Sequence, residues 1–211
     1  MRISAFVVIL LLLISCSSKN TTLPILGPKQ FSNVGFEGGI KADTIYHTIR
    51  DFSFVDQDSN MVTNETFRDK IYVADFFFTS CPTICPIMKT QMLRVYQKYS
   101  ENPEVKFLSH SIDPEFDTVA VLHDFAERLG VRTEVWHFVT GIKDSIYSIG
   151  QESYMVTATT DPNEPGGYLH SGAFLLIDKQ RRIRGIYDGT KPDKVDLLMN
   201  DIAILLEEYK P

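Results

Sequence analysis

The sequence predicts an α/β domain in which helices cover both faces of a mixed β-sheet. Apolar runs at 71–78, 105–112 and 136–140 are typical of buried strands. Apolar side chains recur at helical spacing over 84–99 and 119–129, which indicates amphipathic helices. These segments alternate as strand, helix, strand, helix and strand, and a β-hairpin and a helix follow them. This order is typical of a thioredoxin-like fold.

The first elements of the domain predict an N-terminal β-hairpin. Two phenylalanines alternate with other residues in an extended segment at 51–55, and 61–63 returns beside it. The intervening residues 56–60 are Asp, Gln, Asp, Ser and Asn, which favour a turn. A short helical turn at 64–67 then leads into the first buried strand.

The connection between the second and third buried strands has clear turn and cap residues. Asp113-Pro114 is expected to turn the chain, and Asp117 is expected to be the N-cap of the helix at 119–129. Gly130 is expected to end that helix.

The last third of the chain completes the sheet. A helix is predicted at 142–149, an extended piece at 153–157, and a loop at 161–167, which contains two prolines and two glycines. Segments 172–177 and 182–187 predict a closing hairpin, and a final helix follows at 191–208.

The N-terminus has the features of a secretory signal. Arg2 precedes an apolar run at 3–14 that is too short to span a bilayer comfortably. Residues 13–16, Leu-Ile-Ser-Cys, resemble the lipobox of bacterial lipoproteins, in which the cysteine becomes the acylated first residue. We therefore predict a signal peptide at 1–15 and lipidation of Cys16, with an uncleaved anchor helix or a plain secretory signal as alternatives. The expected location is the cell envelope, as a membrane-anchored lipoprotein with a periplasm-facing domain.

A tether is predicted at 16–42, ahead of a folded domain at 43–211. The residues that follow the anchor cysteine are rich in Ser, Asn, Thr, Gly and Pro and have no sustained apolar period. Such a tether would let the folded domain reach partners above the membrane.

The charge distribution argues against one class of partner. The chain has 21 Lys and Arg against 27 Asp and Glu, which gives a formal net charge of -6. Binding to nucleic acid requires a cationic face, and the sequence has no Lys/Arg cluster of useful length. We therefore expect no nucleic-acid partner.

Three cysteines are present, and lipidation of Cys16 would leave Cys81 and Cys85. This pair lies where a buried strand leads into a helix, a position at which amide N–H groups and the helix dipole lower thiol pKa values. Residues four apart on a helix have Cβ atoms about 5–6 Å apart, whereas a disulfide needs roughly 3.5–4.5 Å. The spacing favours a metal between the sulfurs, although a disulfide stays open if the loop adjusts.

The ligand types indicate which metal would suit. Thiolates select Cu(I) or Zn, and an imidazole beside them would also suit Cu(II). A structural zinc site would normally need a fourth protein ligand. The pattern therefore favours copper.

Three segments resemble motifs of the Sco/SenC copper chaperones. They are FFFTSCPTICP at 76–86, SIDPEFDT at 111–118 and YLHSGAFLLI at 168–177. They occur in the family's order, and the resemblance covers about 51–206. It implies a thioredoxin-like fold that binds one copper, as Cu(I) or Cu(II), through Cys81, Cys85 and His170.

The resemblance also implies a role and partners. Members of the family help to assemble the binuclear copper centre of cytochrome c oxidase. The expected partners are therefore the copper-receiving subunit of that oxidase and a copper donor protein. The chain has Leu169 where the family commonly has an aspartate before the ligand histidine.

Three other functions fit parts of the sequence. A thiol-disulfide oxidoreductase would use Cys81 and Cys85 to reduce the cysteines of a copper-receiving partner, and a copper or redox sensor would use the same pair. Residues 79–83 superficially resemble a peroxiredoxin loop, but Phe78 and Ala74 occupy the positions where that family needs Thr and Pro. The sequence favours a metallochaperone over an enzyme.

Several other chemically capable residues are expected to have structural roles. Met88 and Met92 have helical spacing and are predicted to be core residues, as is Trp136. The remaining histidines are expected at the surface or at a pocket wall rather than on a metal: His47, His110, His123 and His137.

Overall fold

The computed structural model describes residues 22–36, 39–161 and 167–210, except for the side chains of 32–43, 169 and 170. The strands are β1 Lys29–Phe36, β2 Gly39–Tyr46, β3 Ser53–Asp56, β4 Met61–Thr63, β5 Ile71–Phe77, β6 Val105–Ser111, β7 Trp136–Thr140, β8 Ala158–Thr160, β9 Tyr168–His170, β10 Ala173–Ile177 and β11 Ile183–Asp188. The helices are the 3₁₀ turn Asn64–Phe67, α1 Ile84–Tyr99, α2 Val119–Leu129, α3 Lys143–Glu152 and α4 Pro192–Glu208.

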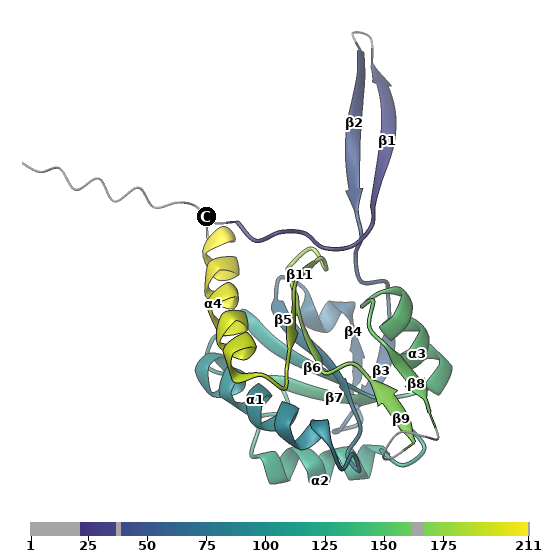
Figure 1. Ribbon diagram of the computed structural model, residues 1–211, viewed down its shortest axis with the longest axis vertical. Helices are drawn as coiled ribbons and strands as arrows, with labels where there is room; N and C mark the ends of the chain where they lie inside the picture. The colour runs from purple at the N-terminus through teal and green to yellow at the C-terminus, as the bar shows by residue number, and fades with distance from the viewer. Residues whose placement is uncertain (1–21, 37–38, 162–166, 211) are drawn as a thin grey trace, which may run out of the picture.

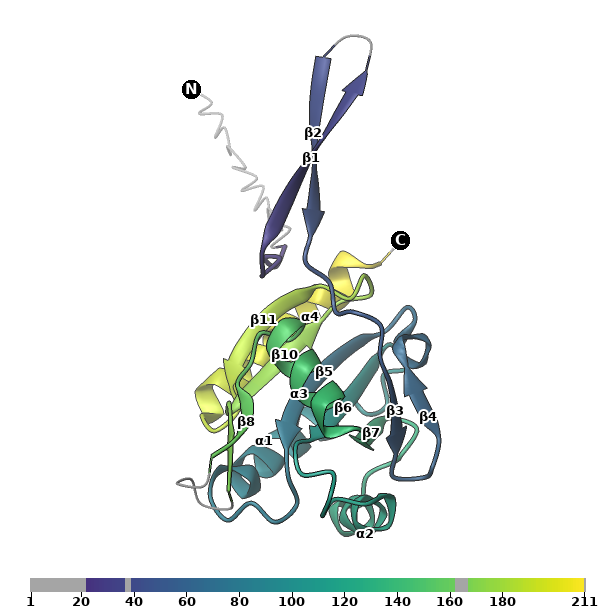
Figure 2. The same cartoon turned by 90° about the vertical axis from the view of Figure 1, so that its right-hand side faces the viewer.

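A seven-stranded sheet forms the centre of the domain, in the order β11-β10-β5-β6-β7-β3-β4. Strands β5, β6 and β7 are parallel, and the other pairs in this sheet are antiparallel. Consecutive side chains of a strand point to opposite faces, so Phe76 and Phe77 of β5 mark the two faces. Phe125 of α2 stacks on Phe77 with 5.5 Å between ring centroids, while α3 packs on Phe76 through Gly150. Figures 1 and 2 show helices on both sides of the sheet, so the predicted α/β fold with its N-terminal hairpin β3–β4 is confirmed.

The parallel strands bring two loops together. The carboxyl ends of β5, β6 and β7 lie at the same edge of the sheet because these strands run in the same direction. The loop that carries the cysteines follows β5, and the Asp113-Pro114 loop follows β6. Open α/β sheets commonly bind ligands at such an edge.

Two local predictions were wrong. The extended piece predicted at 153–157 lies further along the chain as β8, because α3 continues to Glu152 and the N–H groups of Ser153 and Tyr154 both bond to the Ile149 carbonyl. Asp117 is not the N-cap of α2. The side chain of Thr118 caps the helix by accepting from the Val121 N–H across 3.4 Å.

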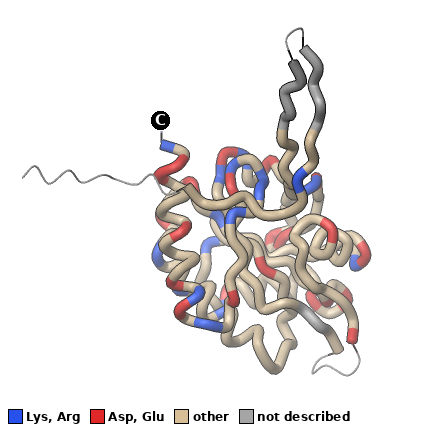
Figure 3. The backbone as a smooth tube through the Cα atoms, turned by 45° about the horizontal axis from the view of Figure 1, so that its top comes forward, with Lys and Arg blue, Asp and Glu red and all other residues tan. Residues whose placement is uncertain are grey.

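The residues ahead of the domain carry structure that the sequence pattern did not predict. Strands β1 and β2 pair along their length, and Figures 1 and 2 show this hairpin projecting from the body. At its base the Lys29 Nζ and the Arg182 guanidinium lie over the Tyr46 ring, 5.4 and 5.2 Å from its centroid. Figure 3 shows Lys and Arg residues near the base of the hairpin.

The predicted signal peptide and Cys16 lie outside the described residues. Within the part of the chain that the structure describes, no helix combines the length and the apolar character needed to cross a membrane.

His110 occupies the centre of the core, so the prediction of a surface or pocket-wall position was wrong for this residue. Its side chain is 0% exposed and stacks on Phe76 with 4.6 Å between ring centroids. Phe54 and Tyr154 contact the imidazole edge-on. Neither ring nitrogen has a hydrogen-bond partner among the described residues. Burial lowers the pKa of His110 to about 4, and the backbone and charge of Asp75 oppose this shift only in part.

The predicted core residues and the other three histidines have different surroundings. Met88, Met92 and Trp136 are each 0% exposed, which confirms their predicted place in the core. His137 is largely buried and its Nδ1 lies 3.0 Å from the Asp56 carboxylate, whereas His123 is exposed and contacts Asp58. His47 is half-buried and bonds to the Ser153 carbonyl through Nε2.

Candidate metal centre

Cys81 and Cys85 lie in the turn that joins β5 to α1. The Cys81 N–H donates to the Phe78 carbonyl across 3.3 Å, and α1 begins at Ile84, which places Cys85 in its first turn. Cys81 is 7% exposed and Cys85 is 4% exposed. No disulfide joins the two sulfurs. The pair therefore occupies the strand-to-helix junction that the sequence predicted.

The two thiols have different electrostatic environments. Burial raises the pKa of Cys81, but hydrogen bonds from Thr83 and Cys85 outweigh this effect and hold the pKa below its ordinary value. The Thr83 hydroxyl lies 3.6 Å from the Cys81 sulfur. Burial raises the pKa of Cys85 far above its ordinary value, and the hydrogen bond to Cys81 adds to this rise. Cys81 is therefore the more reactive of the two thiols, because the thiolate is the nucleophile and the metal ligand.

Asp117 fixes the cysteine loop to the loop after β6. Its carboxylate accepts from the Thr79 N–H across 3.1 Å, from the Thr79 hydroxyl, and from the Ser111 hydroxyl across 2.5 Å. Burial raises the pKa of Asp117, although these hydrogen bonds oppose the rise. Asp117 therefore joins the loop that carries the cysteines to the loop that follows β6.

The strand that carries His170 lies beside the same loops. In β9 the Tyr168 ring packs on Phe78 with 5.1 Å between centroids, and its hydroxyl donates to Asp113 across 2.7 Å. The backbone of His170 pairs with Ala158 of β8, while the His170 side chain lies outside the described part of the structure.

A second contact brings this segment to the cysteines. Gly172 lies close to Ile84, the residue that precedes Cys85, because a Cβ added at Gly172 would be 3.8 Å from the Ile84 Cδ1. The structure therefore brings the backbone that follows His170 to the cysteine loop. Among the described side chains, no three from His, Cys, Asp and Glu lie close enough together to hold a metal ion.

Two grooves flank the cysteine loop. One, of about 280 Å³, reaches both sulfurs between α1 and α2 and is lined by Phe78, Thr79, Cys81, Cys85, Pro86, Lys89, Thr90, Leu93, Phe125 and Leu129. The other, of about 420 Å³, lies on the side of β9 and is lined by Ile84, Ser171, Gly172, Ala173, Ile186, Tyr187, Asp188 and Thr190. A groove therefore borders the cysteine loop on each of two sides, although both cysteines are buried.

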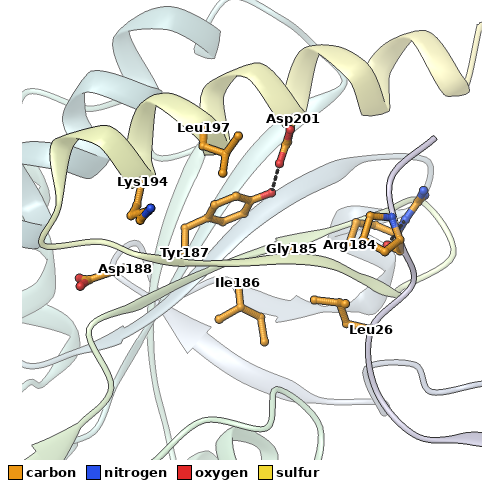
Figure 4. A pocket seen from close by; sticks show the side chains of 10 residues that line it. Leu26, Arg184, Gly185, Ile186, Tyr187, Asp188, Lys194, Leu197 and Asp201 are labelled. Carbon is orange, nitrogen blue, oxygen red and sulfur yellow. Dashed lines mark hydrogen bonds between the residues drawn. The ribbon is translucent and has the colours of Figure 1, made fainter. Parts of the chain in front are cut away.

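A third groove continues along β11. It has a volume of about 390 Å³ and lies between β11 and α4, where the Tyr187 hydroxyl donates to Asp201 across 2.7 Å beneath Leu197 (Figure 4). It shares residues 186–188 with the groove beside Ile84.

A buried ion pair lies under the cysteines, and the sequence reasoning missed it. The Lys89 ammonium is 2.8 Å from the Asp75 carboxylate, with side chains 6% and 0% exposed. Ser109 donates to the same carboxylate and accepts from the Trp136 indole N–H across 2.9 Å. Two signals pointed to this pair: an aspartate inside the apolar run of β5, and a lysine one helical turn after Cys85.

Solved structures of other proteins share this architecture. A SCO1/SenC family lipoprotein from Bacillus anthracis is 27% identical, with a TM-score of 0.69 over 76% of this chain and 95% of that chain. BsSco, a member of the Sco family of cytochrome c oxidase assembly proteins in which a disulfide switch was identified, is 28% identical, with a TM-score of 0.67 over 78% of this chain and 95% of that chain. Arabidopsis thaliana ScoI, solved with copper bound, is 27% identical, with a TM-score of 0.63 over 76% of this chain and 98% of that chain.

The sequence comparison identifies the same family. The profile described as SCO1/SenC matches residues 41–207. The match includes the cysteine loop, the loop after β6 and strand β9, and it covers well over half of the 211 residues. The chain belongs to the SCO1/SenC family.

Proposed function

We propose that this chain is a copper metallochaperone that binds one copper through Cys81, Cys85 and His170. It would use the metal to help assemble the binuclear copper centre of cytochrome c oxidase. Copper is the cargo in this proposal, received from a donor protein and passed to the copper-receiving subunit of the oxidase. The copper-bound ScoI structure and the description of BsSco support this assignment.

One observation carries the proposal: two segments far apart in the sequence meet at the cysteine loop. Ile84 approaches Gly172, and Phe78 packs against Tyr168. His170 belongs to strand β9, which begins at Tyr168 and leads to Gly172, so its backbone is part of the segment that meets the cysteine loop. Two sulfurs and an imidazole form a soft ligand set that suits both copper oxidation states.

The thiol environments support a second candidate function. A depressed pKa at Cys81 beside a protonated Cys85 suits a dithiol that attacks a disulfide, since the thiolate is the attacking species. The chain would then reduce the cysteines of the copper-receiving partner, or report the copper or redox state as a sensor. The disulfide switch of BsSco favours such chemistry in that relative.

The proposal includes the membrane. Lipidation of Cys16 would hold the protein on a membrane of the cell envelope, with the domain facing the periplasm. The lipobox-like residues ahead of Cys16 and the lipoprotein description of the Bacillus anthracis structure support this part.

An anaerobic copper titration of the reduced protein tests the ligand set. The parent should bind one equivalent of Cu(I) or Cu(II), and X-ray absorption should report two sulfur ligands and at least one nitrogen ligand. Cys81→Ala, Cys85→Ala and His170→Ala should each weaken binding sharply. His123→Ala is the matched control, because His123 is exposed and contacts Asp58 rather than the cysteine loop.

The same variants also distinguish the copper chaperone from the thiol-disulfide oxidoreductase. If His170→Ala binds both oxidation states like the parent, the three-ligand assignment fails. If His170→Ala keeps full disulfide-reducing activity while losing copper, the oxidoreductase is the better description.

A further inference from the structure

Residues 22–28 form a strap that is bound to the folded body. The Leu26 N–H donates to the Ile183 carbonyl across 2.8 Å, and the Leu23 N–H donates to the Glu208 carboxylate across 2.5 Å. Both leucines pack against the hydrophobic core. The strap therefore lies on the edge strand β11 and at the end of α4, where the sequence predicted a tether.

Arg184 is the centre of this attachment. Its guanidinium donates to the carbonyls of Leu23 and Pro24 across 2.6 and 3.0 Å. It also pairs with the carboxylates of Asp178 and Glu208 at 3.2 and 2.7 Å, and its side chain is only 6% exposed. A buried guanidinium must have its donors satisfied. The strap supplies two of these acceptors, so displacing the strap would leave donors of a buried guanidinium unpaired and destabilise the folded body.

The strap lies close in sequence to the predicted lipid. Residues 17–21 separate Cys16 from Thr22, and six residue steps span at most about 20 Å when fully extended. A lipid on Cys16 lies at the bilayer surface. The strap end of the body then stays within about 20 Å of that surface, whatever path the intervening residues take.

The cysteines lie at the other end of the sheet. Ile177 of β10 pairs with Tyr72 at the start of β5, so the β10–β11 turn beside the strap lies where β5 begins. Cys81 follows the far end of β5. Helix α4 spans the same distance: its last residue, Glu208, contacts the strap, and Thr190 ahead of its first turn lines the groove beside Ile84. A helix of 17 residues is about 25 Å long.

We infer that the anchored chain is held with its strap end toward the bilayer and its cysteine pair facing away from the membrane. The inference rests on the proposed lipidation of Cys16. The hairpin β1–β2 projects from this same end of the body, so it also points toward the bilayer (Figure 1). The site then presents copper at most about 45 Å above the lipid, given the helix length and the reach of the chain. The fitting recipient is a domain that projects this far from the same membrane.

Headgroup quenching of site-specific labels tests this orientation. A fluorescent amino acid is incorporated at Gln180, in the turn beside the strap, or at Ile142, which follows β7 at the cysteine end; both positions are exposed. The lipidated full-length protein is placed in vesicles of phosphatidylcholine and phosphatidylglycerol that carry a nitroxide quencher on the headgroup. We expect at least threefold stronger quenching at Gln180. Equal quenching at the two positions overturns the inference.

Two changes should abolish this difference. Arg184→Ala removes the guanidinium that binds the Leu23 and Pro24 carbonyls of the strap. Arg181→Ala is the matched control, since Arg181 pairs with Asp51. A Gly-Ser linker of ten residues inserted before Thr22 lengthens the chain between Cys16 and the strap and leaves the folded body unchanged. The quenching of this variant can therefore be interpreted even if Arg184→Ala folds poorly. An unchanged difference after the insertion contradicts the inference.

The outcomes separate the inference from the proposed function. Mass spectrometry of the vesicle-bound chain shows whether Cys16 is acylated, and its absence overturns the anchor and the orientation together. Copper binding by the same samples is measured separately and should be equal in all the variants.

Discussion

The buried imidazole of His110 predicts a loss of stability in mild acid. Its pKa is lowered to about 4 in the folded protein from an ordinary value of 6.5, because burial among aromatic rings disfavours the charged form. Between these values the unfolded chain binds more protons than the folded chain. The contribution of His110 is therefore complete above pH 6.5 and is lost as the pH falls toward 4. Linkage gives a loss of about 3 kcal/mol between pH 7 and pH 4 from this residue.

Urea unfolding at a series of pH values measures this loss. Trp136 is the only tryptophan in the chain and is fully buried, so its fluorescence reports the transition. The parent is compared with His110→Phe, which cannot bind a proton, and only the change between pH 7 and pH 4 is compared, so that any packing difference cancels. We expect the variant to lose about 3 kcal/mol less than the parent over this range.

A control isolates the buried residue. His123→Gln removes an exposed histidine whose pKa Asp58 raises, so the variant should keep the acid-induced loss of the parent or show a slightly larger one, because His110 is intact. If His110→Phe loses as much stability as the parent between pH 7 and pH 4, the buried imidazole does not have the depressed pKa and the reasoning fails.

Three further predictions concern the core and the site. Lys89→Met should destabilise the protein by about 3–5 kcal/mol in urea unfolding, because it leaves the Asp75 carboxylate buried without its partner; a second change, Asp75→Asn, should recover part of this loss. Tyr168→Phe removes the hydroxyl that anchors β9 to the loop after β6, and should weaken copper binding by roughly threefold to tenfold in a competition titration with little change in Tm. Gly189→Ala places a Cβ 2.7 Å from a neighbouring phenylalanine ring, and should lower the unfolding free energy by about 1–3 kcal/mol.

The sequence predicted those parts of the fold that local pattern determines. The strand-to-helix junction at Cys81 could be predicted because a buried apolar run, two prolines and a helical repeat all lie within a few residues of it. The core positions of Met88 and Met92 followed from the same helical period. The spacing of the two cysteines also indicated their shared chemistry before their surroundings were known.

The sequence could not predict features that depend on contacts between residues far apart in the chain. Asp117 had the pattern of a helix cap, but its carboxylate bonds to Thr79, 38 residues earlier in the chain. The strap had no strand or helix period because its partners lie far along the chain: the carbonyl of Leu23 meets Arg184 161 residues later. The ion pair of Lys89 with Asp75 needed the helix to be placed over the sheet before its two charges could be recognised as neighbours.

The strap also protects an exposed β-edge. Strand β11 is the last strand on its side of the sheet, and edge strands with unpaired backbone groups can add a strand from another molecule. Leu26 occupies one such acceptor, the carbonyl of Ile183. A shortened chain that began at residue 43 would lose this cover and leave the buried Arg184 without two of its acceptors. Soluble versions of the protein should therefore begin at or before Thr22, since those that begin later would be prone to self-association through β11.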